Sequence, residues 1–137
     1  MIEFIESKSM KVDVLKHQQK NISSKEKIQK VLKENNALGF DITKDKEIVG
    51  FAMLREYAKN KYFLWVYAID KNFQGQGLGK KCLKALIEFL KQNYGCVELS
   101  TTYKIGNKSA KTLYGSLGFK EIEKIEEENE VDMLLKL

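Results

Sequence analysis

The chain changes character at Gln74-Gly75-Gln76-Gly77-Leu78-Gly79-Lys80-Lys81, where three glycines fall within five residues. Before this stretch, residues 62–69 form an almost unbroken apolar and aromatic run, which is typical of a central strand buried on both faces. After it, apolar residues recur with helical period from Leu78 to about Asn93, which predicts an amphipathic helix. The glycine-rich stretch is therefore expected to be a loop that joins a buried strand to the first turn of a helix.

A loop of this kind is suited to binding an anion. Glycines have no β-carbon to keep a ligand away from the backbone. The first amides of the following helix have no partner inside the helix, and the helix dipole favours negative charge at the same place. Lys80 and Lys81 add positive charge to this turn. For the glycines alone, a tight strand-to-helix turn with glycines for packing remains the alternative.

Two common nucleotide-binding motifs do not fit this loop. A P-loop needs Gly-Lys-Ser/Thr after four intervening residues, and here Cys82 follows Lys81. A dinucleotide-binding fingerprint needs G-x-G-x-x-G, whereas only one residue separates Gly77 from Gly79. Both of these nucleotide-binding classes are excluded.

The rest of the chain predicts a mixed α/β fold. The expected order is strand, two helices, three strands, helix, strand, helix and two strands, which favours a mixed sheet with helices on both faces. The expected strands are residues 2–6, 38–43, 48–57, 62–69, 96–102, about 119–124 and 131–137. The expected helices are residues 9–17, 24–34, 78 to about 93, and a last helix that Gly118 ends.

Composition indicates one globular domain, residues 1–137, without an internal linker. The sequence has no proline and no run of 18 apolar residues that could span a membrane. Its first residues are acidic, unlike those of a signal peptide, so we expect a cytoplasmic protein. In that compartment Cys82 and Cys96 are expected to be free thiols.

The net charge of +5 is unevenly distributed along the chain. The last 17 residues carry seven acidic residues against two lysines, so the positive excess lies in the first 120 residues. A basic body suits a polyanionic partner, either nucleic acid or a phosphate-rich cofactor. The acidic end could attract a cation, or it could be a solvated turn.

Two motifs resemble those of the GNAT superfamily of acetyltransferases. Gln74, Gly77 and Gly79 occupy the fixed places of its pyrophosphate-binding motif, Q/R-x-x-G-x-G/A. Downstream, the stretch from Asn107 to Phe119 matches the family helix N-x-x-A-x-x-L-Y-x-x-L-G-F at every fixed position. The resemblance covers essentially the whole chain, because the order of the expected elements also fits. It implies a mostly antiparallel sheet of about seven strands, splayed between the fourth and fifth, with four helices on both faces.

The resemblance also implies direct transfer of an acetyl group from acetyl-CoA to an amine. Backbone amides of the loop would bind the pyrophosphate, and the end of the fourth strand would pair with the pantetheine arm. Tyr114 would protonate the departing thiolate, since a phenol with a pKa of about 10 can donate to it. No Cys/His cluster with zinc spacing is present, so no metal is expected. The implied cofactor-binding residues are Tyr67, Ala68, Ile69, Gln74, Gly75, Gln76, Gly77, Leu78, Gly79, Lys80 and Asn107.

The general base is not identified by the resemblance. Several family members carry a glutamate on the fourth strand, at the position that Phe63 holds here. Glu98 and Tyr103, on or near the fifth strand, are the alternatives, as is a chain of water molecules. His17, the only histidine, falls in the first expected helix, near where the acceptor usually enters.

Three stretches, residues 50–53, 74–86 and 130–137, resemble bacterial spermine/spermidine-type acetyltransferases, which predicts a polyamine acceptor. A polyamine channel needs carboxylates, and the candidates are Glu56, Asp70, Glu98 and the acidic cluster of Glu126, Glu127, Glu128 and Glu130. Other acceptors stay open: an aminoglycoside, an amino acid, or a protein lysine or N-terminus. A non-catalytic nucleic-acid-binding module is disfavoured, because no RNP-like motif, zinc finger or helix-turn-helix signature is present. The oligomeric state is left open, a homodimer included.

Overall fold

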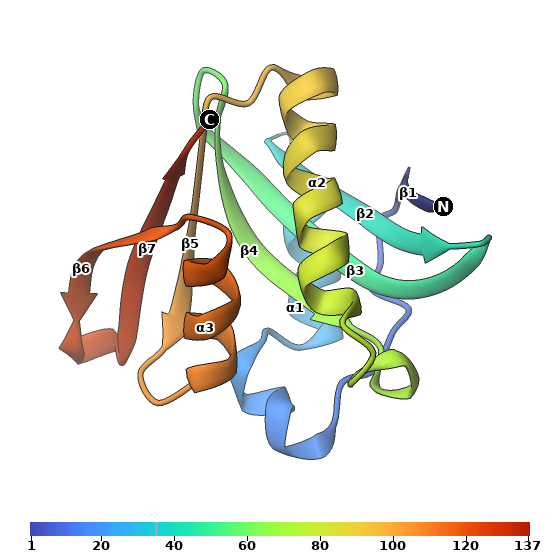
Figure 1. Cartoon of the computed structure of the whole chain (residues 1–137), viewed down its shortest axis with the longest axis horizontal. Coiled ribbons are helices and arrows are strands. Elements are labelled where there is room, and N and C mark those ends of the chain that lie inside the picture. The colour runs from blue at the N-terminus through green and yellow to red at the C-terminus, as the bar shows by residue number, and fades with distance from the viewer. Residues whose placement is uncertain (35) are drawn as a thin grey trace.

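The computed structural model describes residues 1–34 and 36–137, and these residues form a seven-stranded sheet with helices on both faces (Figure 1). The strand order is β1-β2-β3-β4-β5-β7-β6. The strands are β1 (Ile2–Glu6), β2 (Ala37–Lys44), β3 (Glu47–Ala58), β4 (Lys61–Ile69), β5 (Glu98–Lys104), β6 (Lys120–Ile125) and β7 (Glu130–Lys136). The helices are α1 (Lys25–Val31), α2 (Leu78–Tyr94) and α3 (Lys108–Ser116), with short 3-10 turns η1 (Lys16–Asn21), η2 (Lys71–Phe73) and η3 (Glu126–Glu128). The expected mixed α/β architecture is confirmed.

Two hydrophobic clusters fix the helices to the sheet. On the face that α2 covers, Leu83, Leu86 and Leu90 are fully buried against the strands. On the opposite face α1 contributes Ile28, which packs with apolar residues of β3 and β4 such as Phe51. Burial of such side chains is the main favourable contribution to the free energy of folding.

Neighbouring strands are antiparallel throughout the sheet except for β4 and β5. The parallel pairing of β4 with β5 runs from Lys61 opposite Glu98 to Leu64 opposite Thr101. At its end the Thr101 hydroxyl donates a hydrogen bond to the Leu64 carbonyl at 2.9 Å. Beyond this point the two strands diverge (Figure 1), which confirms the expected splay.

A β-bulge in β4 lies where the divergence begins. Leu54 of β3 pairs with Leu64, and Met53 pairs with Val66, so Trp65 is an extra residue without a partner in β3. A bulge bends its strand and reverses the faces that the following side chains meet. Accordingly, Leu64 belongs to the cluster under α2, whereas Val66 belongs to the cluster under α1. The bulge therefore turns the end of β4 away from β5.

The expected helix over residues 9–17 is wrong, and the described residues contain three α-helices rather than four. Burial alternates along this segment: Met10 and Val12 are buried, whereas Lys11 and Asp13 are exposed. Alternation with a period of two is typical of an extended chain, and the two apolar side chains complete the cluster under α1. The 3-10 turn η1 follows this extended segment.

The two cysteines are free and buried, as expected. Burial raises the pKa of both the Cys82 and the Cys96 thiol, so neither is a reactive thiolate near neutral pH. Among the helices of the described residues, none combines the length and apolar character that a membrane crossing needs.

Candidate functional site

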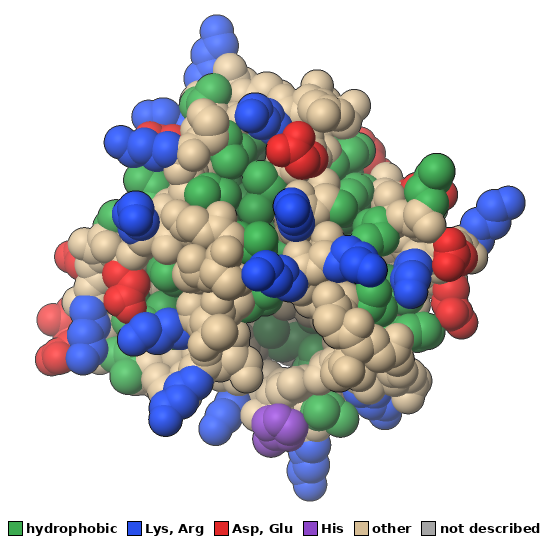
Figure 2. Space-filling model, in the orientation of Figure 1, with side chains coloured by type: hydrophobic (Ala, Val, Ile, Leu, Met, Phe, Trp, Pro, Cys, Tyr) green, Lys and Arg blue, Asp and Glu red, His purple; other side chains and the backbone are tan. Residues whose placement is uncertain are grey.

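A cleft of about 790 Å³ opens where β4 and β5 diverge. Figure 2 shows it as a hollow just above the single histidine, His17. Its walls come from η1, β4, the glycine-rich loop with the first turn of α2, the end of β5, and α3. Ten of the twelve residues expected to bind cofactor or act in catalysis line it: Tyr67, Ala68, Ile69, Gln74, Gly75, Gly77, Leu78, Gly79, Asn107 and Tyr114. The other two, Gln76 and Lys80, are exposed beside it.

The glycine-rich loop presents helix amides that no side chain of the described residues caps. Gly77 precedes α2 in a left-handed conformation, with a φ of 76° that glycine adopts without strain. Gly77 has no side chain that could accept a hydrogen bond from the amides of the first turn. The first amide of the helix with a backbone partner is that of Lys81, which donates to the Gly77 carbonyl at 3.3 Å. The amides of Leu78, Gly79 and Lys80 are therefore available to a ligand.

Open space lies in front of these glycines. A β-carbon built on Gly77 or Gly79 would meet no other described atom within 4 Å, whereas one on Gly50 would lie 2.7 Å from the Ala68 carbonyl oxygen. Gly77 also needs its left-handed backbone, but Gly79 is helical, so neither packing nor conformation requires glycine there. A group bound against the backbone would require it, and the pyrophosphate that the GNAT motif predicts would be such a group.

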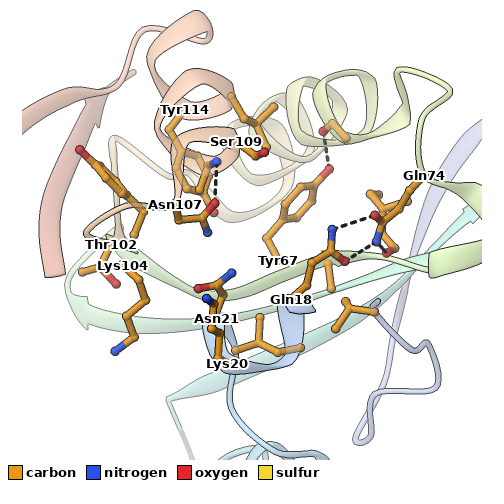
Figure 3. A pocket seen from close by; sticks show the side chains of 18 of the residues that line it. Gln18, Lys20, Asn21, Tyr67, Gln74, Thr102, Lys104, Asn107, Ser109 and Tyr114 are labelled. Carbon is orange, nitrogen blue, oxygen red and sulfur yellow. Dashed lines mark hydrogen bonds between the residues drawn. The ribbon is translucent and has the colours of Figure 1, made fainter. Parts of the chain in front are cut away.

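Side-chain hydrogen bonds hold the loop in place (Figure 3). The side-chain amide of Gln74 donates to the Ile69 carbonyl at 3.0 Å and exchanges two bonds with the amide of Gln18, at 2.8 and 2.9 Å. The Tyr67 hydroxyl donates to the carbonyl of Gly79 at 2.6 Å. Burial raises the pKa of Tyr67 well above its usual range, so the phenol keeps the proton that this bond needs. Gln18 thereby ties η1 to the glycine-rich loop.

The helix α3 places Tyr114 and Asn107 on the opposite wall (Figure 3). Tyr114 is buried, its ring lies 5.4 Å from that of Phe119, and burial raises the pKa of its hydroxyl. A phenol that stays protonated at neutral pH can act as a general acid. Asn107 caps the helix by accepting from the Ala110 amide at 3.3 Å, and its own NH2 group bonds to no described residue.

The candidates for the general base lie in different places. Tyr103 lines the cleft, but its hydroxyl donates to Glu121 at 2.8 Å, and burial together with this carboxylate raises its pKa to about 12. Such a phenol keeps its proton at neutral pH and is a poor base. Glu98 lies outside the cleft, 3.8 Å from the Lys61 ammonium. His17 lines the cleft, is exposed, and forms no hydrogen bond with another described residue.

Of the carboxylates expected to bind a polyamine, Glu130 lines the cleft, and the others form a group outside its lining in the described part of the chain. Asp70 accepts from the backbone amide of Asp13 at 2.9 Å and so fixes the segment that precedes η1. Glu56 accepts from the Asn60 amide at 3.1 Å in the turn between β3 and β4. The residues in this group are Glu56, Asp70, Glu98, Glu126, Glu127 and Glu128.

Several residues that line the cleft were not found from the sequence. Lys20, Lys27 and Lys104 reach it from η1, α1 and β5, and Trp65 reaches it from the bulge in β4. Glu130, which the sequence does place among the acidic candidates, also lines it, from β7, and pairs with Lys104 at 3.3 Å. No sequence signal marks these lysines, because single lysines in a chain with 24 basic residues form no motif.

The fold and the position of the cleft are typical of the GNAT superfamily. The model of the acetyltransferase (GNAT) family matches residues 6–119, so the chain belongs to this family. A GNAT family acetyltransferase from Elizabethkingia anophelis with acetyl-CoA bound has a TM-score of 0.76 to this structure at 17% sequence identity. The match covers 99% of this chain and 98% of that one, and it shows that the fold is shared.

Curated relatives match part of the chain. The spermine/spermidine N(1)-acetyltransferase of Bacillus subtilis is 39% identical over 80 residues, which cover 53% of this chain and 53% of that protein. The [ribosomal protein bS18]-alanine N-acetyltransferase of Escherichia coli is 33% identical over 84 residues, which cover 61% and 55%. The chain therefore spans about half the length of the curated relatives it matches.

Proposed function

We propose that this chain is an acetyl-CoA-dependent N-acetyltransferase that moves an acetyl group directly to a primary amine. The observation that carries the proposal is the meeting, in one cleft, of uncapped helix amides, the diverging edge of β4 and Tyr114. Membership of the GNAT family supports it. A binding module without catalysis would not need a protonated phenol opposite the amides.

The cofactor-binding end is argued from the backbone. Acetyl-CoA would supply the thioester that the amine attacks. The amides of Leu78, Gly79 and Lys80 would hold its pyrophosphate where the dipole of α2 favours negative charge. The edge of β4 from Tyr67 to Ile69, past its divergence from β5, could pair with the pantetheine arm as an added strand. The free NH2 group of Asn107 would donate to the same arm.

The transfer itself needs three groups of this chain. A backbone amide at the end of β4 would polarise the carbonyl at which negative charge develops. Tyr114, kept protonated by its burial, would donate its proton to the leaving sulfur. The attacking amine must lose a proton, and His17 is the candidate base that the cleft favours, with a chain of water molecules as the alternative.

For the acceptor, the similarity to the spermine/spermidine acetyltransferase supports a polyamine such as spermidine or spermine as the first candidate. Glu130 is the carboxylate that a polyamine would meet in the cleft. The similarity to the ribosomal-protein alanine acetyltransferase keeps a peptide N-terminus as a candidate. An aminoglycoside, an amino acid and a protein lysine are the remaining acceptors.

The experiment is a thiol-release assay with acetyl-CoA and the purified chain. The panel of amines contains spermidine, spermine, putrescine, an aminoglycoside, amino acids and a lysine peptide, and mass spectrometry identifies the acetylated product. We expect at least one amine to raise thiol release in proportion to enzyme concentration. Binding of acetyl-CoA in a calorimeter without release for any amine would overturn catalysis, and absence of binding would overturn the whole proposal.

A further inference from the structure

The part of the cleft away from the glycine-rich loop carries more cationic than anionic side chains. Lys20, Lys27 and Lys104 line it, and among the described residues Glu130 is the one acidic side chain that does. Lys104 already neutralises Glu130, at 3.3 Å. Lys20 and Lys27 form no ion pair with another described residue. Figure 3 shows Lys104 at the other end of the view from Gln74 of the loop, and Lys20 between the two, next to Asn21.

Trp65 supports this cationic surface. The Lys27 ammonium lies 5.9 Å from the centroid of the Trp65 ring, and the Arg55 guanidinium lies 4.8 Å from it. A ring face attracts a cation without neutralising it, because the ring has a quadrupole and no net charge. Lys27 therefore has a preferred place beside the cleft and retains its full charge for a ligand. Arg55 in addition pairs with Glu34.

We propose, on the basis of the acetyltransferase function above, that the acceptor is a small primary amine that also carries an anionic group, a carboxylate or a phosphate. The lysines would bind the anionic group and leave the amine to face β4 and Tyr114. This inference departs from the polyamine that the sequence similarity supports, because spermidine would meet three lysines and one glutamate that is already paired, and like charges repel.

The anionic group takes no part in the bonds that change. The amine nitrogen forms a bond to the acetyl carbon, the bond from that carbon to sulfur breaks, and Tyr114 gives its proton to the sulfur. The proton that the amine loses goes to His17 or to water. The lysines act on the position of the acceptor, so their loss should raise the KM for the acceptor more than it lowers kcat.

The test compares pairs of amines that differ in one group. Pentylamine and 5-aminopentanoate each have one primary amine and differ in the carboxylate, and ethanolamine and phosphoethanolamine differ in the phosphate. Spermidine is the fifth substrate, and kcat/KM is measured at saturating acetyl-CoA. We expect kcat/KM to be at least about tenfold higher for the anionic member of one pair, a ratio that falls with added salt. The pair that responds identifies the anionic group.

A double variant, Lys20→Gln with Lys27→Gln, locates the effect. It should raise the KM for the preferred anionic amine about fivefold or more and leave kcat and the KM for acetyl-CoA unchanged. Lys84→Gln, on an exposed part of α2 outside the cleft, is the matched control and should change neither KM. An unchanged KM in the double variant would overturn the role of these lysines.

The outcomes separate this inference from the function on which it rests. If kcat/KM for spermidine or pentylamine equals or exceeds kcat/KM for both anionic amines, the proposal of an anionic acceptor is wrong and the acetyltransferase function stands. If neither these five amines nor the wider panel of acceptors above releases thiol, the acetyltransferase function falls, and the inference falls with it.

Discussion

The two ends of the cleft are built in different ways. At the α2 end the groups that face the cleft are backbone amides, and the side chains of Gln74 and Tyr67 hold that backbone in place. At the other end they are side chains from three separate segments, Lys20, Lys27 and Lys104. Backbone amides keep their places through many substitutions as long as the turn keeps its shape, whereas side chains change one at a time. A cleft of this kind can keep its cosubstrate while its acceptor changes.

The largest effect is expected from Gly79→Val, which changes the α2 end of the cleft alone. The new side chain fits the helical backbone but fills the space in front of the amides. We expect affinity for acetyl-CoA to fall about 10³-fold, because up to three charge-assisted hydrogen bonds are blocked. The thermal unfolding midpoint should not fall, since replacing a helical glycine favours the helix. Calorimetric titration and thermal denaturation measure the two quantities.

Gly115→Ala is the matched control for this variant. Gly115 is also helical, in α3, a β-carbon there also meets no described atom within 4 Å, and it does not line the cleft. Gly79 is a cleaner position than Gly77, where any side chain would be strained by the left-handed backbone. Near-normal affinity in a folded Gly79→Val protein would mean that no ligand packs against these amides.

Tyr114→Phe tests the chemistry between the two ends. The ring and its contact with Phe119 remain, while the general acid is lost, so kcat should fall by about 10²-fold and affinity for acetyl-CoA should change little. Because burial raises the pKa of Tyr114, this group should give no loss of activity below about pH 10 in the native enzyme. Tyr94→Phe, at the far end of α2 and outside the cleft, is the control. Unchanged turnover would make Tyr114 a packing residue.

Gln18→Ala sharpens the comparison, because Gln18 connects the two ends through its paired bonds with Gln74. We expect affinity for acetyl-CoA to fall about fivefold, the value of roughly 1 kcal/mol for a net hydrogen bond. The neighbouring Gln19→Ala is the control, since Gln19 is exposed and does not line the cleft. Equal behaviour of the two variants in titration would show that the loop keeps its shape without η1.

The smallest effect concerns the acidic turn after β6. If Glu126, Glu127 and Glu128 attract a polyamine from a distance, changing the three to glutamine raises the KM for spermidine about twofold at low salt and not at high salt. The same variant should lower the KM for an anionic amine, which gives the two acceptor classes opposite signs. The KM values are measured by steady-state kinetics at two ionic strengths. An unchanged KM for both acceptor classes would mean that the acidic residues form a solvated turn with no role in attracting the acceptor.

The α2 end of the cleft could be predicted from sequence because its geometry requires particular residue types. A ligand can approach the backbone closely where β-carbons are missing, and Gly77 and Gly79 stand at a fixed spacing at the start of a helical pattern. The sequence also predicts which side of that helix is buried, since Leu83, Leu86 and Leu90 repeat with its period.

The end of the cleft that carries the lysines could not be predicted in the same way. The sequence pattern predicts a helix that includes Met10 and Val12, but both pack as part of an extended segment, and the position of the turn that carries Lys20 follows from that path. The bulge at Trp65 lies inside an unbroken apolar run, where no residue marks the change of face. Which lysines face the cleft depends on both features, and both are consequences of tertiary packing.

The short parallel pairing between β4 and β5 has a mechanical consequence. It connects one part of the sheet, strands β1 through β4, to the other part, strands β5 through β7. The pairing involves only residues 61–64 and 98–101, and the hydrogen bond from the Thr101 hydroxyl lies at its end. Because this pairing has so few hydrogen bonds, we expect it to be the hinge of the sheet, so that thermal motion changes the angle between the two parts of the sheet about Leu64. A ligand that contacts both parts of the sheet would restrict this motion, so amide hydrogen exchange of the residues in the β4–β5 pairing should slow when the cleft is filled.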